Sequence, residues 1–213
     1  MKIFGFVFSL FLLAGVFGCS TSYQAGGELQ PGRYALRRGD PKMALVHFQR
    51  AAEIDPNYTT DFTVLKQGVW TYIGRAHYNA GNFPEALKAL ERANSLHNDD
   101  YLADLYLGLA FARQGNQEAG RKGIETGLRG LGNWFEYIDQ YHPDGNYWDP
   151  GRVIREQIQK DLNMLGGREV NWTEVIASAE RIGDAMEDEI EQAPRRWYRD
   201  QRNSDSRGDD GRE

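Results

Sequence analysis

Hydrophobic residues recur at helical spacing along most of the chain, and the pattern is clearest between Gln67 and Asp100. Two apolar stripes with steps of three and four residues lie there, one on each side of Gly81-Asn82. Their members are Trp70, Ile73, Gly74, Ala76 and Tyr78 on the first stripe, and Phe83, Ala86, Leu87, Leu90, Ala93 and Leu96 on the second. Such steps place side chains on one face of an α-helix. The pattern therefore predicts two amphipathic helices joined by a tight turn at a glycine.

This turn has counterparts on both sides of it. Gly39-Asp40 lies 42 residues before Gly81-Asn82, and the Ala-Leu pair that follows each glycine recurs with it. Gly115-Asn116 follows 34 residues after Gly81. A period of about 34 residues is typical of the tetratricopeptide repeat (TPR), a helix–turn–helix unit. The segment from Gln67 to Asp100 resembles this repeat best, and the resemblance extends over residues 32–131.

Two of the three repeats are imperfect. The first has a clear second helix that ends at Asp55-Pro56-Asn57, but Pro31-Gly32 limits its first helix to about residues 33–38. The third repeat has glycines in its second helix, at positions 120, 123 and 127, and each is expected to cost about 1 kcal/mol relative to alanine. The resemblance implies an all-α fold: a TPR-type helical solenoid of about three repeats.

Residues 132–193 predict a helical hairpin that caps the solenoid. Asn133 opens a short helix, Asp149 caps a second one that begins at Pro150, and Asn171 with Glu174 has the spacing of a capping box before a third. The last two carry apolar stripes: Val153, Ile154, Ile158, Leu162 and Leu165, then Trp172, Val175, Ile176, Ala179, Ile182, Met186 and Ile190. From residue 194 mixed charges replace this spacing, which predicts a disordered tail over residues 194–213.

The first residues have the layout of an export signal: Lys2, then an uncharged run to Gly18. An uncleaved membrane anchor is the alternative, although the run is shorter than the roughly 20 residues that a transmembrane helix needs. The run ends in Val16-Phe17-Gly18-Cys19, which resembles the lipobox of bacterial lipoproteins, and Cys19 is the only cysteine. The resemblance implies that residues 1–18 are a removable signal peptide and that Cys19 carries the lipid, palmitate included.

Further features of a lipoprotein follow from this resemblance. Ser20 stands after the cysteine where an aspartate would retain the protein at the inner membrane, so we expect an outer-membrane lipoprotein facing the periplasm. Residues 19–31 are polar and contain glycine, and we expect them to form a flexible tether.

Charge and motifs exclude several functions. The net charge of −6 disfavours nucleic acid and anionic lipid as main partners. The four histidines are isolated, without a second ligand at metal spacing, and no nucleophile elbow or phosphate-binding loop is found. The sequence therefore predicts no enzyme, no cofactor and no metal site.

The resemblance to TPR repeats implies a concave inner face built from first-helix side chains. That face would hold Arg33, Leu36, Arg37, Thr71, Arg75, Tyr78, Asn79, Leu102, Leu105, Leu109 and Arg113. Its four arginines could clamp the carboxylates of an acidic or extended peptide, or they could pair with nearby Asp and Glu. Leu102, Leu105 and Leu109 in the third repeat would form an exposed apolar patch on this face. We therefore expect either the C-terminal hairpin or a partner protein to cover them.

An aromatic group follows the repeats: Trp134, Phe135, Tyr137, Tyr141, Tyr147 and Trp148. It could be the core between solenoid and cap, or a sugar-binding site. The lipobox together with the repeats favours a membrane-anchored periplasmic scaffold that mediates protein–protein interaction in an envelope complex of the secretion, pilus or outer-membrane assembly type. A cell-wall or glycan-binding lipoprotein that uses the aromatic group is the alternative.

Overall fold

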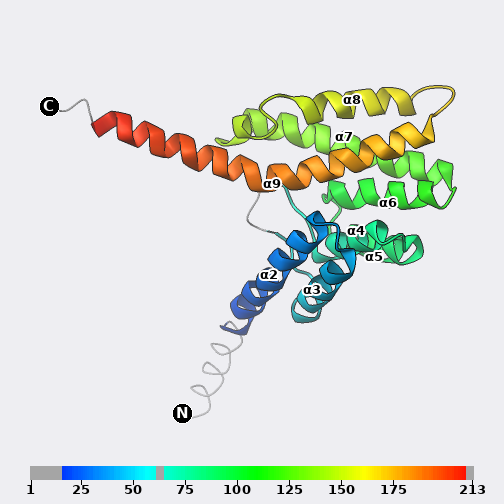
Figure 1. Ribbon diagram of the computed structural model, residues 1–213, viewed down its shortest axis with the longest axis horizontal. Coiled ribbons are helices and arrows are strands. Elements are labelled where there is room, and N and C mark those ends of the chain that lie inside the picture. Colours follow the sequence, from blue (N-terminus) through cyan, green and yellow to red (C-terminus); the bar gives the residue numbers. More distant parts are fainter. Residues whose placement is uncertain (1–15, 61–64, 210–213) are drawn as a thin grey trace, which may run out of the picture. The chain divides into compact units, whose positions relative to one another are not determined.

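The computed structural model describes residues 16–60 and 65–209, and the regular elements in these ranges are helices (Figure 1). They are α2 (Val16–Arg37), α3 (Pro41–Ile54), α4 (Val69–Asn79), α5 (Phe83–Leu96), α6 (Tyr101–Arg113), α7 (Gln117–Tyr141), the short 3-10 helix η1 (Gly145–Tyr147), α8 (Val153–Leu165) and α9 (Trp172–Asp209). The helices form two compact units, α2 to α5 and α6 to α9. The prediction of an all-α helical repeat fold is confirmed.

The three predicted turns have the same hydrogen bonds. The amides of Gly39, Gly81 and Gly115 each donate to the carbonyl three residues earlier, and the next amide donates to the carbonyl five residues earlier. This is the Schellman arrangement, which requires positive φ at the glycine, and the three values lie between 75° and 84°. The side chains of Asp40 and Asn116 then cap the following helices. The recurrence read from the sequence is therefore a recurrence of backbone geometry.

In the first unit, the hairpin of α2 and α3 packs through α3 against the hairpin of α4 and α5. The rings of Phe48 and Tyr72 join α3 to α4, with their centroids 5.2 Å apart. Gly74 on α4 leaves room for Leu90 on α5, whose Cγ would lie only 2.4 Å from a Cβ at position 74. Small residues in α4 thus let the paired helices approach closely.

The N-terminal helix is longer than predicted. We expected a flexible tether over residues 19–31 and helix only from about residue 33, but α2 is continuous across both. Ala25 and Leu29 are buried, and Gly32 lies against the ring of Phe48. Because this stripe packs on α3, its burial offsets the hydrogen bond that Pro31 cannot donate. The predicted signal peptide falls largely on residues outside the described ranges.

The glycines that were expected to weaken the third repeat have a packing role in the second unit. A Cβ at Gly108 of α6 would lie 2.2 Å from the backbone nitrogen of Ile124, and one at Gly123 of α7 would lie 2.5 Å from the Cα of Gly108. A Cβ at Gly120 would lie 2.9 Å from Ala112 of α6, and one at Gly127 would lie 2.5 Å from the backbone nitrogen of Leu105. The two helices therefore touch backbone to backbone along a glycine seam, which we define as Gly108, Gly120, Gly123 and Gly127.

The helices that follow differ from the prediction at three boundaries. Asn133 lies inside α7, because Leu131, Trp134 and Phe135 continue its buried face. Helix α8 begins at Val153 and not at Pro150, and Asp149 reaches forward to accept from the amides of Ile154 and Arg155. Helix α9 continues to Asp209, through residues expected to be disordered.

A partly buried network of polar and charged side chains explains the extension of α9 beyond Pro194. Arg196 donates to both carboxylate oxygens of Glu189, at 2.7 and 3.0 Å, and to the carbonyl of Tyr147. The hydroxyl of Tyr147 donates to Asp200 at 2.5 Å. These contacts hold residues 196–200 against the loop that contains η1, and the sequence spacing alone does not reveal them.

The glycine seam predicts that Gly123→Ala destabilises the protein. A methyl group there meets backbone atoms, which cannot rotate away, so we expect a loss of about 1–3 kcal/mol in the free energy of unfolding. Urea denaturation followed by circular dichroism would measure it. Gly132→Ala in the same helix is the control: its Cβ would meet only Ile158, at 3.8 Å. We expect that variant to gain up to about 1 kcal/mol, and equal effects of the two substitutions would contradict the seam.

Candidate functional site

The predicted inner-face residues are divided between the two units, and in the first unit several of them are buried. Arg33 and Arg75 are only 5% and 2% exposed, and Thr71 and Tyr78 are also buried. Arg75 donates to the side chain of Gln67 at 3.3 Å. In the first unit this leaves Arg37 and Asn79 as the exposed members of the set. The two buried guanidinium groups are thus not placed to clamp an external peptide.

The remaining inner-face residues belong to the second unit, where α9 packs on α6. Leu102, Leu105 and Leu109 are fully buried. Arg113 forms an ion pair with Glu180 of α9, with 2.6 Å between nitrogen and oxygen. The C-terminal hairpin, which was one of the two covers considered for these leucines, therefore packs on this helix.

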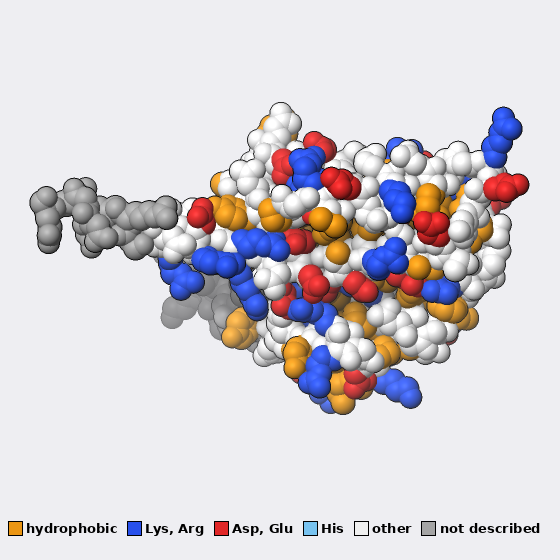
Figure 2. Space-filling view, turned by 45° about the horizontal axis from the view of Figure 1, so that its top comes forward, with side chains coloured by type: hydrophobic (Ala, Val, Ile, Leu, Met, Phe, Trp, Pro, Cys, Tyr) orange, Lys and Arg blue, Asp and Glu red, His pale blue; other side chains and the backbone are white. Residues whose placement is uncertain are grey.

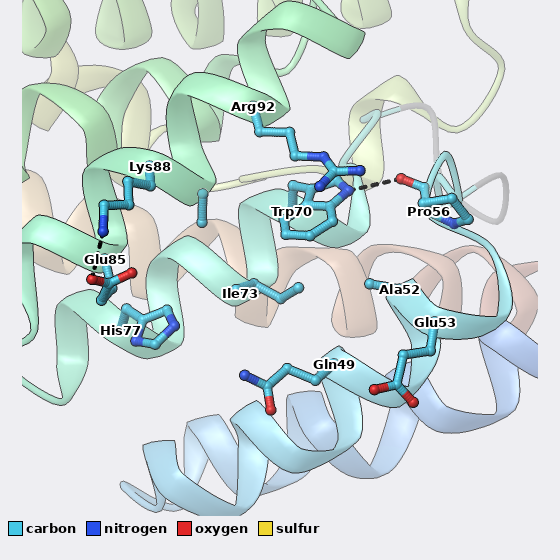
Figure 3. Close-up of a pocket in the computed structure, with 11 residues that line it drawn as sticks. Gln49, Ala52, Glu53, Pro56, Trp70, Ile73, His77, Glu85, Lys88 and Arg92 are labelled. Atoms are coloured by element: carbon cyan, nitrogen blue, oxygen red, sulfur yellow. Dashed lines mark hydrogen bonds and ion pairs between the residues drawn. The ribbon is translucent and has the colours of Figure 1, made fainter.

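A cleft in the first unit lies between α3, α4 and α5. This Trp70 cleft has a volume of about 710 Å³. Its lining residues are Gln49, Ala52, Glu53, Pro56, Trp70, Ile73, His77, Glu85, Lys88, Ala89 and Arg92. Figure 3 shows the side chains of α4 and α5 along one wall and those of α3 along the other.

Helical spacing explains why these side chains meet. Trp70, Ile73 and His77 follow one another at steps of three and four along α4, and Glu85, Lys88 and Arg92 do so along α5. The floor is apolar, because Ala52, Ile73 and Ala89 are buried. Charged and amide side chains surround this floor.

Trp70 is held in place by two contacts. Its indole nitrogen donates to the carbonyl of Pro56 at 2.8 Å, which joins α4 to the end of α3. The guanidinium of Arg92 lies over the indole ring, 3.7 Å from its centroid (Figure 3). A cation so close to a tryptophan face contributes about 0.5–1 kcal/mol at an exposed site. The pair forms a preorganised, amphipathic surface at the rim.

The other wall residues balance one another electrostatically. Lys88 and Glu85 form an exposed ion pair at 2.8 Å, which lowers the pKa of Glu85. Burial lowers the pKa of His77, and the charge of Glu85 opposes this shift. An apolar floor with one stacked cation and both signs of charge around it is suited to the non-covalent binding of a peptide segment.

A second cleft of about 570 Å³ lies between α7 and α8 in the second unit. Its cations have local partners: Arg155 binds Asp139 at 2.7 Å, Arg129 binds Glu125 at 2.7 Å, and Lys160 lies 3.6 Å from Glu174. In the Trp70 cleft, by contrast, Arg92 lies over an indole ring, so we take that cleft as the candidate site.

The aromatic group after the repeats divides into two parts. Trp134, Phe135 and Trp148 are buried, and Trp134 makes edge-to-face contacts with both others at centroid distances of 5.0 Å. Tyr137 and Tyr141 are exposed. The tryptophans are thus core of the second unit, which was the first of the two interpretations.

The histidines have separate environments. His47 contacts a carboxylate oxygen of Glu28 at 2.8 Å, and His97 is half-buried. No group of three potential metal ligands occurs among the residues that the structure describes.

The sequence identified the residues of the Trp70 cleft only as parts of helical stripes. Trp70 and Ile73 were assigned to packing, and Arg92 was not singled out. The contact between Trp70 and Arg92 depends on how α4 and α5 align with each other. That register is set by the packing of the two helices and not by the spacing within either helix.

Comparison with known families agrees with this architecture. Residues 73–124 match the family model of the tetratricopeptide repeat, from α4 into α7. This part of the chain is similar to repeats that act as protein-binding surfaces in many proteins. No curated protein matches the chain. Within the described ranges, no helix combines the length and apolar character needed to cross a membrane.

The environment of His77 predicts a titration below its ordinary pKa of 6.5. A lowered folded-state pKa means that the unfolded chain takes up the proton first. The stabilisation from the neutral imidazole is therefore complete above pH 6.5 and is lost as the pH falls through the folded-state value. Glu85→Gln should lower the pKa of His77 further, since it removes a nearby negative charge. NMR titration of the imidazole protons would measure the pKa of His77 in the wild type and in Glu85→Gln. Glu91 is exposed and lies outside the cleft, so Glu91→Gln should leave the pKa of His77 unchanged.

Proposed function

We propose that this protein is a membrane-anchored scaffold that binds a partner protein of the cell envelope in the Trp70 cleft. The observation that carries the proposal is the cleft itself, where Arg92 lies over Trp70 above a buried apolar floor. Tryptophan and arginine are the residue types that most often dominate the free energy of protein–protein binding. Because Trp70 is fixed by Pro56, little conformational entropy is lost when a partner binds.

The repeat match supports the scaffold part of the proposal. Helical repeat units expose long surfaces built from the same kind of helix pair, and they bind segments of other proteins. The lining of the cleft combines three helices of the first unit, so a bound segment would contact α3, α4 and α5 at once. We expect an extended or helical segment that presents one apolar side chain to the floor and a carboxylate to Arg92.

The sequence around Cys19 supports the membrane part. A basic residue, an apolar run and a lipobox-like end precede the only cysteine. Since α2 is helical on both sides of position 19, an acylated Cys19 would be followed directly by helix rather than by a long tether. The first unit would then lie close to the membrane surface, within the reach of one helix.

Crosslinking in the native host tests the cleft. A photoreactive amino acid at Gln49, on the exposed rim, should yield one discrete protein adduct, whereas the same group at exposed Gln30 of α2 should not. Arg92→Ala should reduce the adduct about tenfold, because it removes the cation that faces the partner.

Arg38→Ala is the matched control for that experiment. Arg38 also lies over an aromatic ring, that of Tyr34, at 5.4 Å, but outside the cleft. The adduct should persist in this variant. Equal adducts at Gln49 and Gln30, or equal effects of the two arginine substitutions, would show that the cleft does not bind the partner.

Acylation is tested separately with Cys19→Ala. We expect labelled palmitate to be incorporated into the wild-type chain and not into the variant, and the variant to keep its first 18 residues. Mass spectrometry of the purified proteins would read both changes. A cleaved and unmodified wild-type protein would contradict the lipid anchor while leaving the cleft experiment valid.

A further inference from the structure

A basic stripe lies on the exposed side of α9. Arg195, Tyr198, Arg199 and Arg202 follow one another at steps of three, one and three residues, so they share one face of the helix. All four are exposed, with 68% of the Arg195 side chain and 61% of Tyr198 accessible. In Figure 2, blue side chains gather at the left of the described part of the molecule, with hydrophobic and acidic side chains beside them.

The opposite face of the same helical segment is fixed. Arg196 binds Glu189 through two hydrogen bonds and also donates to the carbonyl of Tyr147. Asp200 accepts from the hydroxyl of Tyr147. Because the contacts of Arg196 and Asp200 hold this part of the helix in place, the backbone under the stripe is already ordered. Binding of a ligand therefore costs little conformational entropy of the helix.

The stripe contrasts with the rest of the chain in charge. The protein has a net charge of −6, yet the stripe places three arginines within about 10 Å along the helix axis. Arg195 has only a long ion pair with Glu191, at 3.8 Å. Arg199 and Arg202 have no ion pair with any side chain that the structure describes. Within residues 195–202 these three arginines and Arg196 outnumber the one acidic side chain, Asp200, and charges beyond about 8 Å are largely screened at physiological ionic strength.

We propose that the basic stripe binds the headgroup surface of a membrane that contains anionic phospholipids. Guanidinium groups bind phosphate oxygens in pairs, and an exposed tyrosine beside them favours the interface between headgroups and acyl chains. A convex helix face can lie along a planar surface over its whole length, whereas it encloses little of a peptide. This inference goes beyond the proposed scaffold role and does not depend on acylation of Cys19.

The test uses the full chain with Cys19→Ala, which cannot be acylated. Its binding is measured by sedimentation with phosphatidylcholine vesicles and with vesicles of equal parts phosphatidylcholine and phosphatidylglycerol. The apolar first residues and Lys2 are the same in every variant, so a change in the ratio of the two affinities between variants reports on the stripe. We expect the ratio to favour the anionic vesicles and to fall with added salt. Replacing Arg195, Arg199 and Arg202 with Gln should reduce it about fivefold per arginine, on the order of a hundredfold in total.

A variant with the same change in net charge provides the control. Lys122, Arg129 and Arg168 are exposed residues of the same unit, and their combined replacement by Gln should leave the preference for anionic vesicles largely intact. Tyr198→Ala should weaken binding without changing its dependence on salt. Circular dichroism should be unchanged in each variant, because all the substituted side chains are exposed.

Three outcomes would overturn the proposal. The first is an absence of preference for anionic vesicles in the chain with an intact stripe. The second is an equal loss in the stripe variant and in the control variant, which would assign the effect to net charge. The third is tighter binding of the intact stripe to polyglutamate or duplex DNA than to the anionic vesicles at matched charge concentration, which would identify an acidic protein or a nucleic acid as the occupant.

Discussion

Close approach of paired helices is the constraint on which both units depend. In the second unit, α6 and α7 meet backbone to backbone at Gly108 and Gly123, and a single methyl group at either position would collide with main-chain atoms. In the first unit, Gly74 performs the corresponding role by admitting Leu90 between α4 and α5. A close pair buries apolar surface efficiently, and that burial is the main favourable contribution to folding. Glycine lowers the intrinsic stability of each helix, but it allows the contact that stabilises the pair.

The same close pairing creates the candidate binding surface. With α4 and α5 held together at Gly74, Arg92 of one helix reaches the indole of Trp70 on the other. Helix α3 completes the cleft, because the carbonyl of Pro56 fixes the indole nitrogen. The recognition surface is thus a consequence of packing between neighbouring hairpins. In contrast, two of the four arginines that the repeat resemblance assigned to an inner face, Arg33 and Arg75, are buried, and Arg75 donates to Gln67.

Charge has two separate roles in the second unit. Inside, Asp149, Glu189, Arg155 and Arg196 form a buried network that shapes the loop around η1, with Asp149 itself at positive φ. Removing one member would leave a buried charge unpaired, which is far more costly than losing an exposed ion pair. Outside, the arginines of the basic stripe remain available to solvent. The network therefore holds α9 in place, and the stripe uses the helix that the network extends.

The sequence by itself determined the helical character of the chain and the three glycine turns, because both depend on residues a few positions apart. The helical stripes of α4 and α5 and the positive φ at Gly39, Gly81 and Gly115 follow from spacing and from the freedom of glycine. Only the tertiary structure decided the length of α2 and α9, the glycine seam and the Trp70 cleft. The burial of Ala25 and Leu29 and the hydrogen bond from Arg196 to the carbonyl of Tyr147 depend on residues far away in the chain. Local propensity is a weak guide wherever burial against a distant element supplies the larger free energy.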